Sequence, residues 1–171
     1  MTRLYIDMDG TLARFYAQDN AVEKYRTEDD YFLNLDPYLE MASAVRMLLR
    51  DGIDVVILSS VDSDIRISSV SQKDLWLTNI FGRDNTPPAL YPETGTDKAE
   101  YIRRIYGEIG PESWLIDDYT RNLLDWSAAG GRAIKAINEI NGLGGKWNGP
   151  RVNILTPAND LYREIKELIT A

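Results

Sequence analysis

The stretch Leu4-Tyr5-Ile6-Asp7-Met8-Asp9-Gly10-Thr11-Leu12 places an Asp-x-Asp-Gly sequence directly after a short apolar run. The run predicts a strand, and alternate residues of an extended segment point to the same side, so Asp7 and Asp9 are expected to lie together. Gly10 allows the backbone to turn sharply after the strand, and Thr11 can form a hydrogen bond near that turn. An isolated Asp-x-Asp-Gly is more often a turn or a cation-binding loop, but its place after a strand favours a pair of carboxylates that carries out chemistry.

Short β-rich runs alternate with amphipathic helical stretches along the rest of the chain. This alternation is typical of a parallel sheet covered by helices. The predicted strands are residues 4–6, 53–58, 89–91, 114–116, 133–137 and 152–155, and the predicted helices are residues 41–50, 65–81, 96–106, 121–128 and 159–169. The sequence therefore predicts an α/β fold, a three-layer Rossmann-like arrangement around a parallel sheet.

Residues 13–36 interrupt this alternation, because they are aromatic and acidic and contain no clear strand. We expect them to form a small cap inserted over the carboxyl end of the first strand. The length of 171 residues and the lack of an evident linker predict a single domain over residues 1–171. The glycine-rich stretch 141–145 lacks the strand-then-helix context of a nucleotide-binding loop, so a plain turn is expected there, and no role is assigned to segment 141–149 as a whole.

The composition limits the chemistry that is available, because the chain has no cysteine and no histidine. Disulfides, thiolate nucleophiles and cysteine zinc clusters are excluded, and so are imidazole bases and histidine-ligated metals. Catalysis would have to use carboxylates, hydroxyls, lysine, tyrosine or a hard metal ion.

The charge and hydropathy patterns limit the classes of partner and the cellular compartment that we expect. The 27 acidic residues outnumber the 19 basic ones, giving a net charge of -8, which disfavours binding to extended nucleic acid. The beginning of the sequence lacks the pattern of a secretion signal. The apolar stretch at residues 55–58 is far shorter than the roughly 20 residues needed to span a bilayer. We therefore expect a cytoplasmic protein with no membrane partner; the sequence predicts no particular oligomeric state.

Polar side chains follow several of the predicted strands. Asp7 and Asp9 leave the first strand, Ser59-Ser60 the second and Asp117-Asp118 a later one. Ligands of parallel α/β sheets bind at these carboxyl ends. Carboxylates gathered there would repel one another, so a divalent cation is the natural counter-charge, and oxygen ligands without histidine favour Mg²⁺.

Together these motifs resemble those of the haloacid dehalogenase-like phosphohydrolases. The segment 7–12, Ser59, Lys98 at a helix start and Ile116-Asp117-Asp118 occur in the order of the four motifs of that superfamily, and the likeness covers residues 3 to about 135. A closer likeness is to the 5'(3')-deoxyribonucleotidases. Residues 7–15, which end in Phe15, are similar to the first motif of that family and the Phe that follows it. Residues 31–37 are similar to the segment in which the family's cap returns to the core.

The resemblance implies a role for each carboxylate. Asp7 would attack phosphorus and form an aspartyl-phosphate, while Asp9 would protonate the leaving oxygen and later deprotonate water. Mg²⁺ would be held by the Asp7 carboxylate, the Asp9 backbone carbonyl and Asp118, with Asp117 orienting the metal-bound waters. The transport ATPases of this superfamily place Thr where Asp9 stands, whereas phosphatases and phosphomutases place Asp.

Phosphate binding is implied for Ser59 and Lys98, with Ser60 as the neighbouring hydroxyl. Ser59 and Lys98 would hold the phosphoryl oxygens, and Lys98 would also offset the charge between phosphate and carboxylate. A solvated helix position remains the ordinary interpretation of a lysine such as Lys98 taken alone, and a strand-end hydroxyl that of Ser59.

The aromatic residues Phe15, Tyr31 and Phe32 are candidates for substrate binding. They either pack in the core or form a wall on which a base stacks. The cap is much shorter than the helical insertion of the deoxyribonucleotidases, so much of their base-recognition surface has no counterpart here.

The predicted function is that of a Mg²⁺-dependent phosphomonoesterase acting on a small phosphorylated substrate, with a (deoxy)nucleoside monophosphate as the first candidate. The alternatives are a phosphatase of sugar phosphates or other small metabolites, a polynucleotide-end phosphatase, and a phosphate-binding regulatory module without turnover.

Overall fold

Six parallel strands form one sheet in the computed structural model, which describes residues 2–17, 19–142 and 145–171. The strand order is β3-β2-β1-β4-β5-β6, so β1 lies inside the sheet. The strands are β1 (Arg3–Ile6), β2 (Asp54–Leu58), β3 (Ala89–Leu90), β4 (Ser113–Asp117), β5 (Arg132–Ile137) and β6 (Arg151–Asn153). Every neighbouring pair is parallel, which confirms the predicted α/β fold.

The register of β1 aligns the ends of three strands. Ile6 lies opposite Ile57 of β2 and Ile116 of β4. Asp7, the next residue, donates its backbone N–H to the Ile116 carbonyl at 2.9 Å. Because the strands are parallel, their last residues reach the same side of the molecule, which we call the carboxyl edge, formed by the residues that follow β1, β2 and β4.

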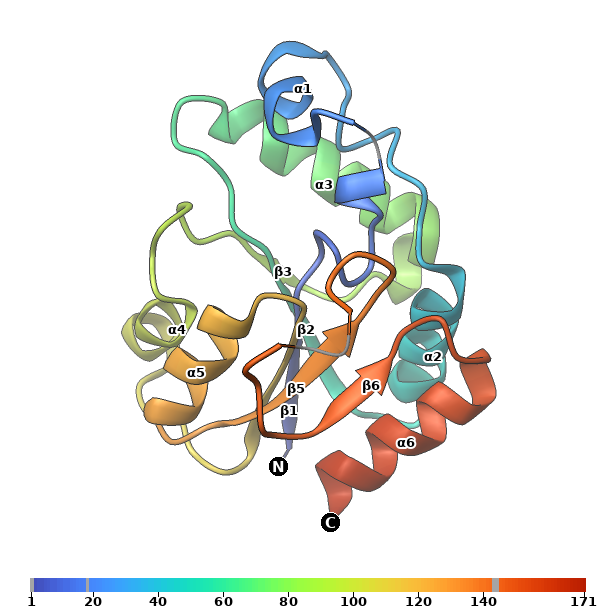
Figure 1. Ribbon diagram of the computed structural model, residues 1–171, viewed down its shortest axis with the longest axis vertical. Helices are drawn as coiled ribbons and strands as arrows, with labels where there is room; N and C mark the ends of the chain where they lie inside the picture. Colours follow the sequence, from blue (N-terminus) through green and yellow to red (C-terminus); the bar gives the residue numbers. More distant parts are fainter. Residues whose placement is uncertain (1, 18, 143–144) are drawn as a thin grey trace.

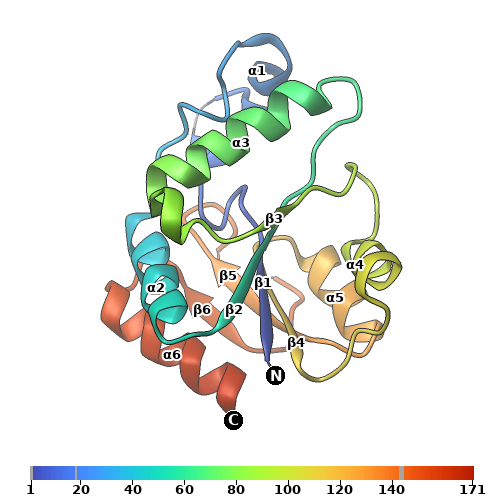
Figure 2. The same cartoon turned by 180° about the vertical axis from the view of Figure 1, so that it is seen from behind.

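Helices cover both faces of the sheet (Figures 1 and 2). One face is covered by α2 (Leu39–Arg50), α3 (Arg66–Phe81) and α6 (Ala158–Thr170), and the other by α4 (Lys98–Tyr106) and α5 (Thr120–Ala128). Figure 2 shows that α3 runs from the α2 side past the carboxyl edge. None of the described helices is long and apolar enough to cross a membrane.

The strands bury side chains on both faces, as their alternation requires. Leu4 and Ile6 of β1 belong to the core under α2 and α6, whereas Tyr5 belongs to the core under α5. The Tyr5 ring meets Trp126 edge to face, with ring centroids 5.0 Å apart. Burial of each such side chain stabilises the fold by about 1.5–3 kcal/mol, so the central strand is fixed from both sides.

Some element boundaries differ from the predicted ones. Strand β6 ends at Asn153 rather than at residue 155, because the Asn153 side chain accepts the backbone N–H of Leu155 at 3.0 Å and turns the chain. Helix α2 begins at Leu39 rather than at residue 41, and Leu39 is 68% exposed, so the apolar periodicity does not reach it.

The segment 13–36, here called the insertion, leaves the sheet after β1 and returns before α2. Apart from residue 18, it consists of the 3-10 helix η1 (Phe15–Ala17), the short helix α1 (Ala21–Thr27) and turns. Its two ends are joined by a hydrogen bond of 2.9 Å from the Arg14 N–H to the Asp36 carbonyl. Figures 1 and 2 show α1 beside the far end of α3, beyond the carboxyl edge.

Helix α3 anchors the insertion through two hydrogen bonds. The Trp76 indole N–H donates to the Leu35 carbonyl at 2.7 Å, and the Phe32 N–H donates to the Gln72 side chain at 3.0 Å. These two bonds attach the insertion to a helix of the core.

In the predicted glycine-rich turn, residues 143 and 144 lie outside the described residues. After it, Trp147 packs in the core beside α5 and donates its indole N–H to the Pro150 carbonyl at 2.9 Å. This packing ties the segment to the sheet on the β5–β6 side.

Candidate active site

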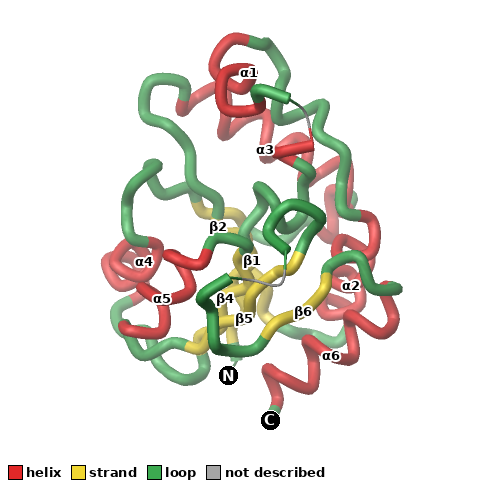
Figure 3. Tube along the Cα trace, viewed as in Figure 1, coloured by secondary structure: helices red, strands yellow, loops and turns green. Residues whose placement is uncertain are grey.

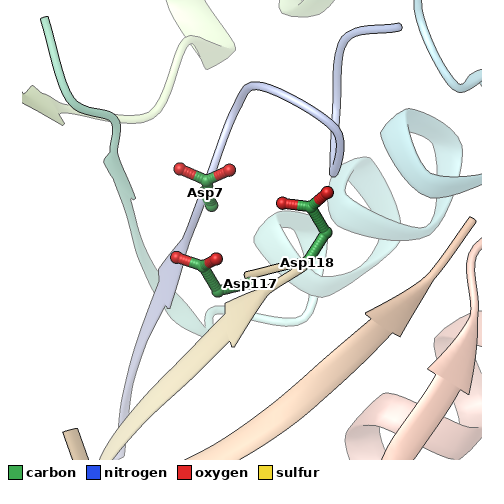
Figure 4. A group of neighbouring side chains, drawn as sticks. All are labelled: Asp7, Asp117 and Asp118. Atoms are coloured by element: carbon green, nitrogen blue, oxygen red, sulfur yellow. The ribbon is translucent and has the colours of Figure 1, made fainter. Parts of the chain in front are cut away.

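The loops that follow the strands gather at the carboxyl edge (Figure 3). Asp7 leaves β1, Asp117 ends β4 and Asp118 follows it, and Figure 4 shows the three carboxylates close together. Each offers an oxygen within 4.8 Å of the others. The structure thus brings together three of the predicted acidic residues.

Asp7 and Asp117 are buried, Asp118 is half-buried, and the three carboxylates affect one another. Burial raises the pKa of the Asp7 carboxyl well above its usual range; Lys98 opposes this shift, and Asp117 and Asp118 add to it. Burial, and then the charge of Asp117, raises the pKa of Asp118 to about 7. Burial is the larger cause of both shifts, and the charges of the neighbouring carboxylates add to it.

The chemistry of this group fits a hard divalent cation. All the donors are carboxylate oxygens, the ligand type that Mg²⁺ prefers, and added positive charge would favour the ionised form of these carboxylates.

The turn after β1 brings Gly10 against Asp118. Gly10 has a φ of +84°, and a Cβ placed on it would lie 2.4 Å from Asp118 Oδ2. Asn138, at the end of β5, donates through Nδ2 to the Gly10 carbonyl at 2.8 Å and to Asp118 Oδ2 at 3.2 Å. Only a residue without a side chain allows this close approach, so Gly10 and Asn138 together position Asp118.

Lys98, the first residue of α4, lies buried between two of the acids. Its Nζ is 2.6 Å from Asp7 Oδ1 and 2.7 Å from Asp117 Oδ2. Burial disfavours its charge, but Asp117 and Asp7 outweigh burial and raise the pKa of the Lys98 ammonium above its usual value. Asp97 caps the helix by accepting the N–H of Ala99 at 2.8 Å, and this cap fixes where Lys98 stands.

Asp117 is held by several donors besides Lys98. Its Oδ1 accepts the Tyr119 N–H at 2.8 Å, and its Oδ2 accepts from the Asn122 side chain at 2.8 Å. A carboxylate with these partners is suited to supporting the site from behind.

Ser59 and Ser60 follow β2, and the structure places them differently. Ser59 is fully buried, and its Oγ accepts a hydrogen bond of 2.8 Å from Lys73 Nζ. Ser60 lines the cavity described below, and its carbonyl also accepts from Lys73, at 3.1 Å.

Asp9 points to a residue that the sequence analysis missed. Its Oδ2 lies 2.5 Å from Nζ of Lys73, a completely buried lysine on α3. A signal was present, because Lys73 stands three and four residues before the buried Trp76 and Leu77, on the inward face of the helix. A lysine in a helix is usually solvated, so the pattern alone did not single it out.

A cavity of about 560 Å³ opens over these groups. Its floor includes Asp7, Asp9 and Lys98, and the insertion supplies one wall. The predicted Phe15 and Phe32 line that wall.

Two further aromatic residues of the insertion, Tyr16 and Tyr25, line the same wall without having been singled out. Tyr31 is not among the residues that line the cavity in the described part of the chain. Its hydroxyl donates to the Phe15 carbonyl at 2.7 Å, and its ring packs edge to face on Phe15 with centroids 5.5 Å apart. Tyr31 therefore supports the wall from behind.

Solved structures with the same fold include phosphatases. The chain is similar to D,D-heptose 1,7-bisphosphate phosphatase from Burkholderia thailandensis, with a TM-score of 0.64 and 14% identity over 98% of this chain and 99% of that chain. The enzyme of that name from B. bronchiseptica, in complex with magnesium and phosphate, has a TM-score of 0.65 and 16% identity, covering 96% of this chain and 99% of that one. A haloacid dehalogenase-like family hydrolase from Streptococcus pneumoniae has a TM-score of 0.61 and 12% identity, covering 91% and 95%.

These likenesses establish a haloacid dehalogenase-like fold over nearly the whole chain. No protein-family model matches the sequence, and no curated protein matches it. The likeness to the 5'(3')-deoxyribonucleotidases remains a prediction.

Proposed function

We propose that the protein is a Mg²⁺-dependent phosphomonoesterase that works through an aspartyl-phosphate on Asp7. The observation that supports this most is the position of Asp7, in a cavity floor, 2.6 Å from the Lys98 ammonium and grouped with two further carboxylates. A turn or a simple cation loop needs neither a buried lysine on the carboxylate nor an adjoining cavity.

In the first step, one Asp7 oxygen attacks phosphorus. A bond forms between that oxygen and phosphorus, the ester P–O bond breaks, and the leaving oxygen takes a proton from Asp9. In the second step, Asp9 accepts a proton from water, the water oxygen bonds to phosphorus, and the Asp7–phosphorus bond breaks to release inorganic phosphate. Asp9 is then protonated again for the next cycle.

Lys98 and the two serines would hold the phosphoryl group. An ammonium has three N–H donors, and Lys98 uses two of them on Asp7 and Asp117, which leaves one for a phosphoryl oxygen. The Ser59 hydroxyl accepts from Lys73, so its own proton is available to donate, and Ser60 lies at the cavity surface.

The residues fit a Mg²⁺ ion held by the carboxylates of Asp7 and Asp118 and the backbone carbonyl of Asp9. When bound, Mg²⁺ supplies positive charge that offsets the charge of the phosphoryl group and of the clustered carboxylates. Asp117, occupied by Lys98, Tyr119 and Asn122, would orient its waters.

A nucleoside monophosphate is the first candidate substrate, and the aromatic wall supports it. Phe15, Phe32, Tyr16 and Tyr25 face a cavity large enough for a small phosphorylated metabolite, and a base can stack on such rings.

A sugar monophosphate is the second candidate, because the heptose bisphosphate phosphatases share the fold. A second phosphate on the substrate is disfavoured by charge. Arg121 and Arg26 stand near the cavity but are already paired, with Asp125 at 2.9 Å and with Asp62 at 2.5 Å respectively. A distal phosphate would meet these carboxylates as well as the arginines.

Phosphate release from a panel of 5' and 3' nucleotides, sugar monophosphates and sugar bisphosphates, with and without Mg²⁺, tests the proposal. Turnover that requires Mg²⁺ and is lost in Asp7→Asn is expected. Binding of these ligands without any phosphate release by the wild-type protein would instead favour a regulatory module, and a preference for sugar phosphates over every nucleotide would remove the nucleotidase assignment.

A further inference from the structure

Lys73 is a buried cation at the edge of the site with no part in the reaction described above. Its side chain is 0% exposed, and its Nζ contacts Asp9 Oδ2 at 2.5 Å, Ser59 Oγ at 2.8 Å and the Ser60 carbonyl at 3.1 Å. The ammonium also lies 4.5 Å from the centroid of the Phe32 ring. This one group therefore joins the turn after β1, the loop after β2 and the insertion.

Lys73 and Lys98 differ in the number of their N–H donors that are already used on protein oxygens. The three N–H donors of Lys73 are matched by three acceptors, all of them protein oxygens. Lys73 has no donor left for a substrate oxygen unless one of these bonds breaks, whereas Lys98 has one. The geometry fits a residue that acts on its neighbours rather than on the substrate.

The Asp9 carboxylate depends on this contact. Its other oxygen, Oδ1, is buried and has no hydrogen-bond partner among the described residues. Within that part of the protein, the contact with Lys73 Nζ is therefore the hydrogen bond that fixes the orientation of the Asp9 carboxylate.

Stability alone is a poor reason for such a lysine. Burying an ammonium is costly, and apolar residues in place of a buried ion pair often leave stability unchanged or raise it. Methionine has a similar shape, and the partner left behind, Asp9, has a side chain that is 22% exposed rather than fully buried.

We propose that Lys73 is a positioning residue for the acid and base Asp9, holding the carboxylate in the orientation in which it exchanges protons with the leaving group and with water; this rests on the proposed phosphatase function.

The two half-reactions allow a sharp test with p-nitrophenyl phosphate. Its phenolate leaves without needing a proton, so formation of the Asp7 phosphoenzyme depends little on Asp9, whereas hydrolysis of that phosphoenzyme needs Asp9 as a base. Lys73→Met is therefore expected to release a burst of one p-nitrophenolate per active site and then turn over about 100-fold more slowly than wild type. With an alkyl phosphate the same variant is expected to lose about 100-fold without a burst, because the first step also needs the acid.

A double-mutant cycle identifies the residue through which Lys73 acts. In the Asp9→Asn background, Lys73→Met is expected to cause little further loss, because the group that it positions is already gone. Lys73→Gln, which retains N–H donors, is a second neutral variant should Lys73→Met fail to fold. Leu75→Met, at an exposed site on the same helix, is the matched control and should behave as wild type.

The outcomes distinguish the inference from the proposed function. A folded Lys73→Met protein with wild-type kinetics, or losses that multiply in the double variant, would overturn the positioning role while leaving the phosphatase intact. A wild-type protein that releases no phosphate from p-nitrophenyl phosphate with Mg²⁺ would overturn both.

Discussion

The carboxyl edge of the sheet and the insertion face each other across one cavity, but they are built in different ways. At the carboxyl edge, strand register fixes the backbone of each acidic residue, and buried lysines bind the side chains at distances of 2.5 to 2.7 Å. The insertion is a short segment rich in aromatic rings that pack on one another, and it is attached to the core by two hydrogen bonds to α3 and by the ion pair of Arg26 with Asp62. The difference suggests a division of the proposed roles, with the chemistry at the carboxyl edge and the choice of substrate in the insertion.

The largest effect is expected from Asp7→Asn, which removes the proposed nucleophile. Loss of a nucleophile lowers kcat by about 10⁴- to 10⁶-fold, and an unchanged circular dichroism spectrum would show that the fold persists. Asp54→Asn is the matched control, since Asp54 lies at the opposite end of β2, where it pairs with Arg3. Equal losses in both variants would mean that the carboxyl edge has no special role.

Comparison of Gly10→Ala with Gly107→Ala should separate the effect of crowding Asp118 from the effect of backbone strain. The added Cβ would meet Asp118 Oδ2, so Mg²⁺ affinity measured by titration calorimetry should fall by about tenfold or more, and stability should fall by about 1–3 kcal/mol. Gly107→Ala has a similar φ, +90°, with open space around the position, and should lose stability alone. Unchanged Mg²⁺ affinity in Gly10→Ala would contradict the placement of the metal at Asp118.

The pH dependence of Mg²⁺ binding tests the electrostatics of the carboxyl edge. The folded, metal-free protein raises the pKa of Asp118 from 3.8 to about 7, so it binds a proton that the unfolded chain has lost. The resulting stabilisation is complete below the unfolded pKa and disappears as the pH rises to about 7, where the carboxylate becomes free to bind metal.

Saturating Mg²⁺ should accordingly raise the Tm by about 5 °C or more at about pH 8 and much less at about pH 5. Differential scanning fluorimetry measures both shifts. Asp118→Asn is the matched variant and should respond weakly at either pH, and an equal response of the wild-type protein at both values would contradict the account.

The smallest effect is expected in the insertion. Tyr16 is 46% exposed and lines the cavity, so Tyr16→Ala should raise the KM for the preferred substrate by about tenfold while leaving kcat for p-nitrophenyl phosphate nearly unchanged. Tyr106→Ala, at an exposed site outside the cavity lining, should change neither quantity. A fall in kcat with p-nitrophenyl phosphate for Tyr16→Ala would show that the insertion takes part in the chemistry.

The same comparison explains what could be predicted from the sequence. Short apolar runs predict the parallel strands, and Asp7, Ser59 and Asp117 follow such runs directly. Their meeting at one edge of the sheet could therefore be inferred from topology alone. Lys98 was predicted from motif order.

What the sequence could not predict depends on tertiary contacts. Lys73 is charged and lies in a helix, and only the packing of α3 against the carboxyl edge turns it inward to Asp9. In the insertion, Tyr31 and Phe32 are neighbours with the same apolar character, and only their packing against Phe15 decides which of them lines the cavity.

Trapping of the phosphoenzyme tests the central claim most directly. The protein is mixed with its best substrate carrying a labelled phosphoryl group and Mg²⁺, quenched in acid within the first turnover, digested and mapped by mass spectrometry. We predict a labelled phosphoryl group on Asp7 in the wild-type protein and none in Asp7→Asn. Full turnover with no label on Asp7, together with an active Asp7→Asn protein, would contradict the covalent mechanism.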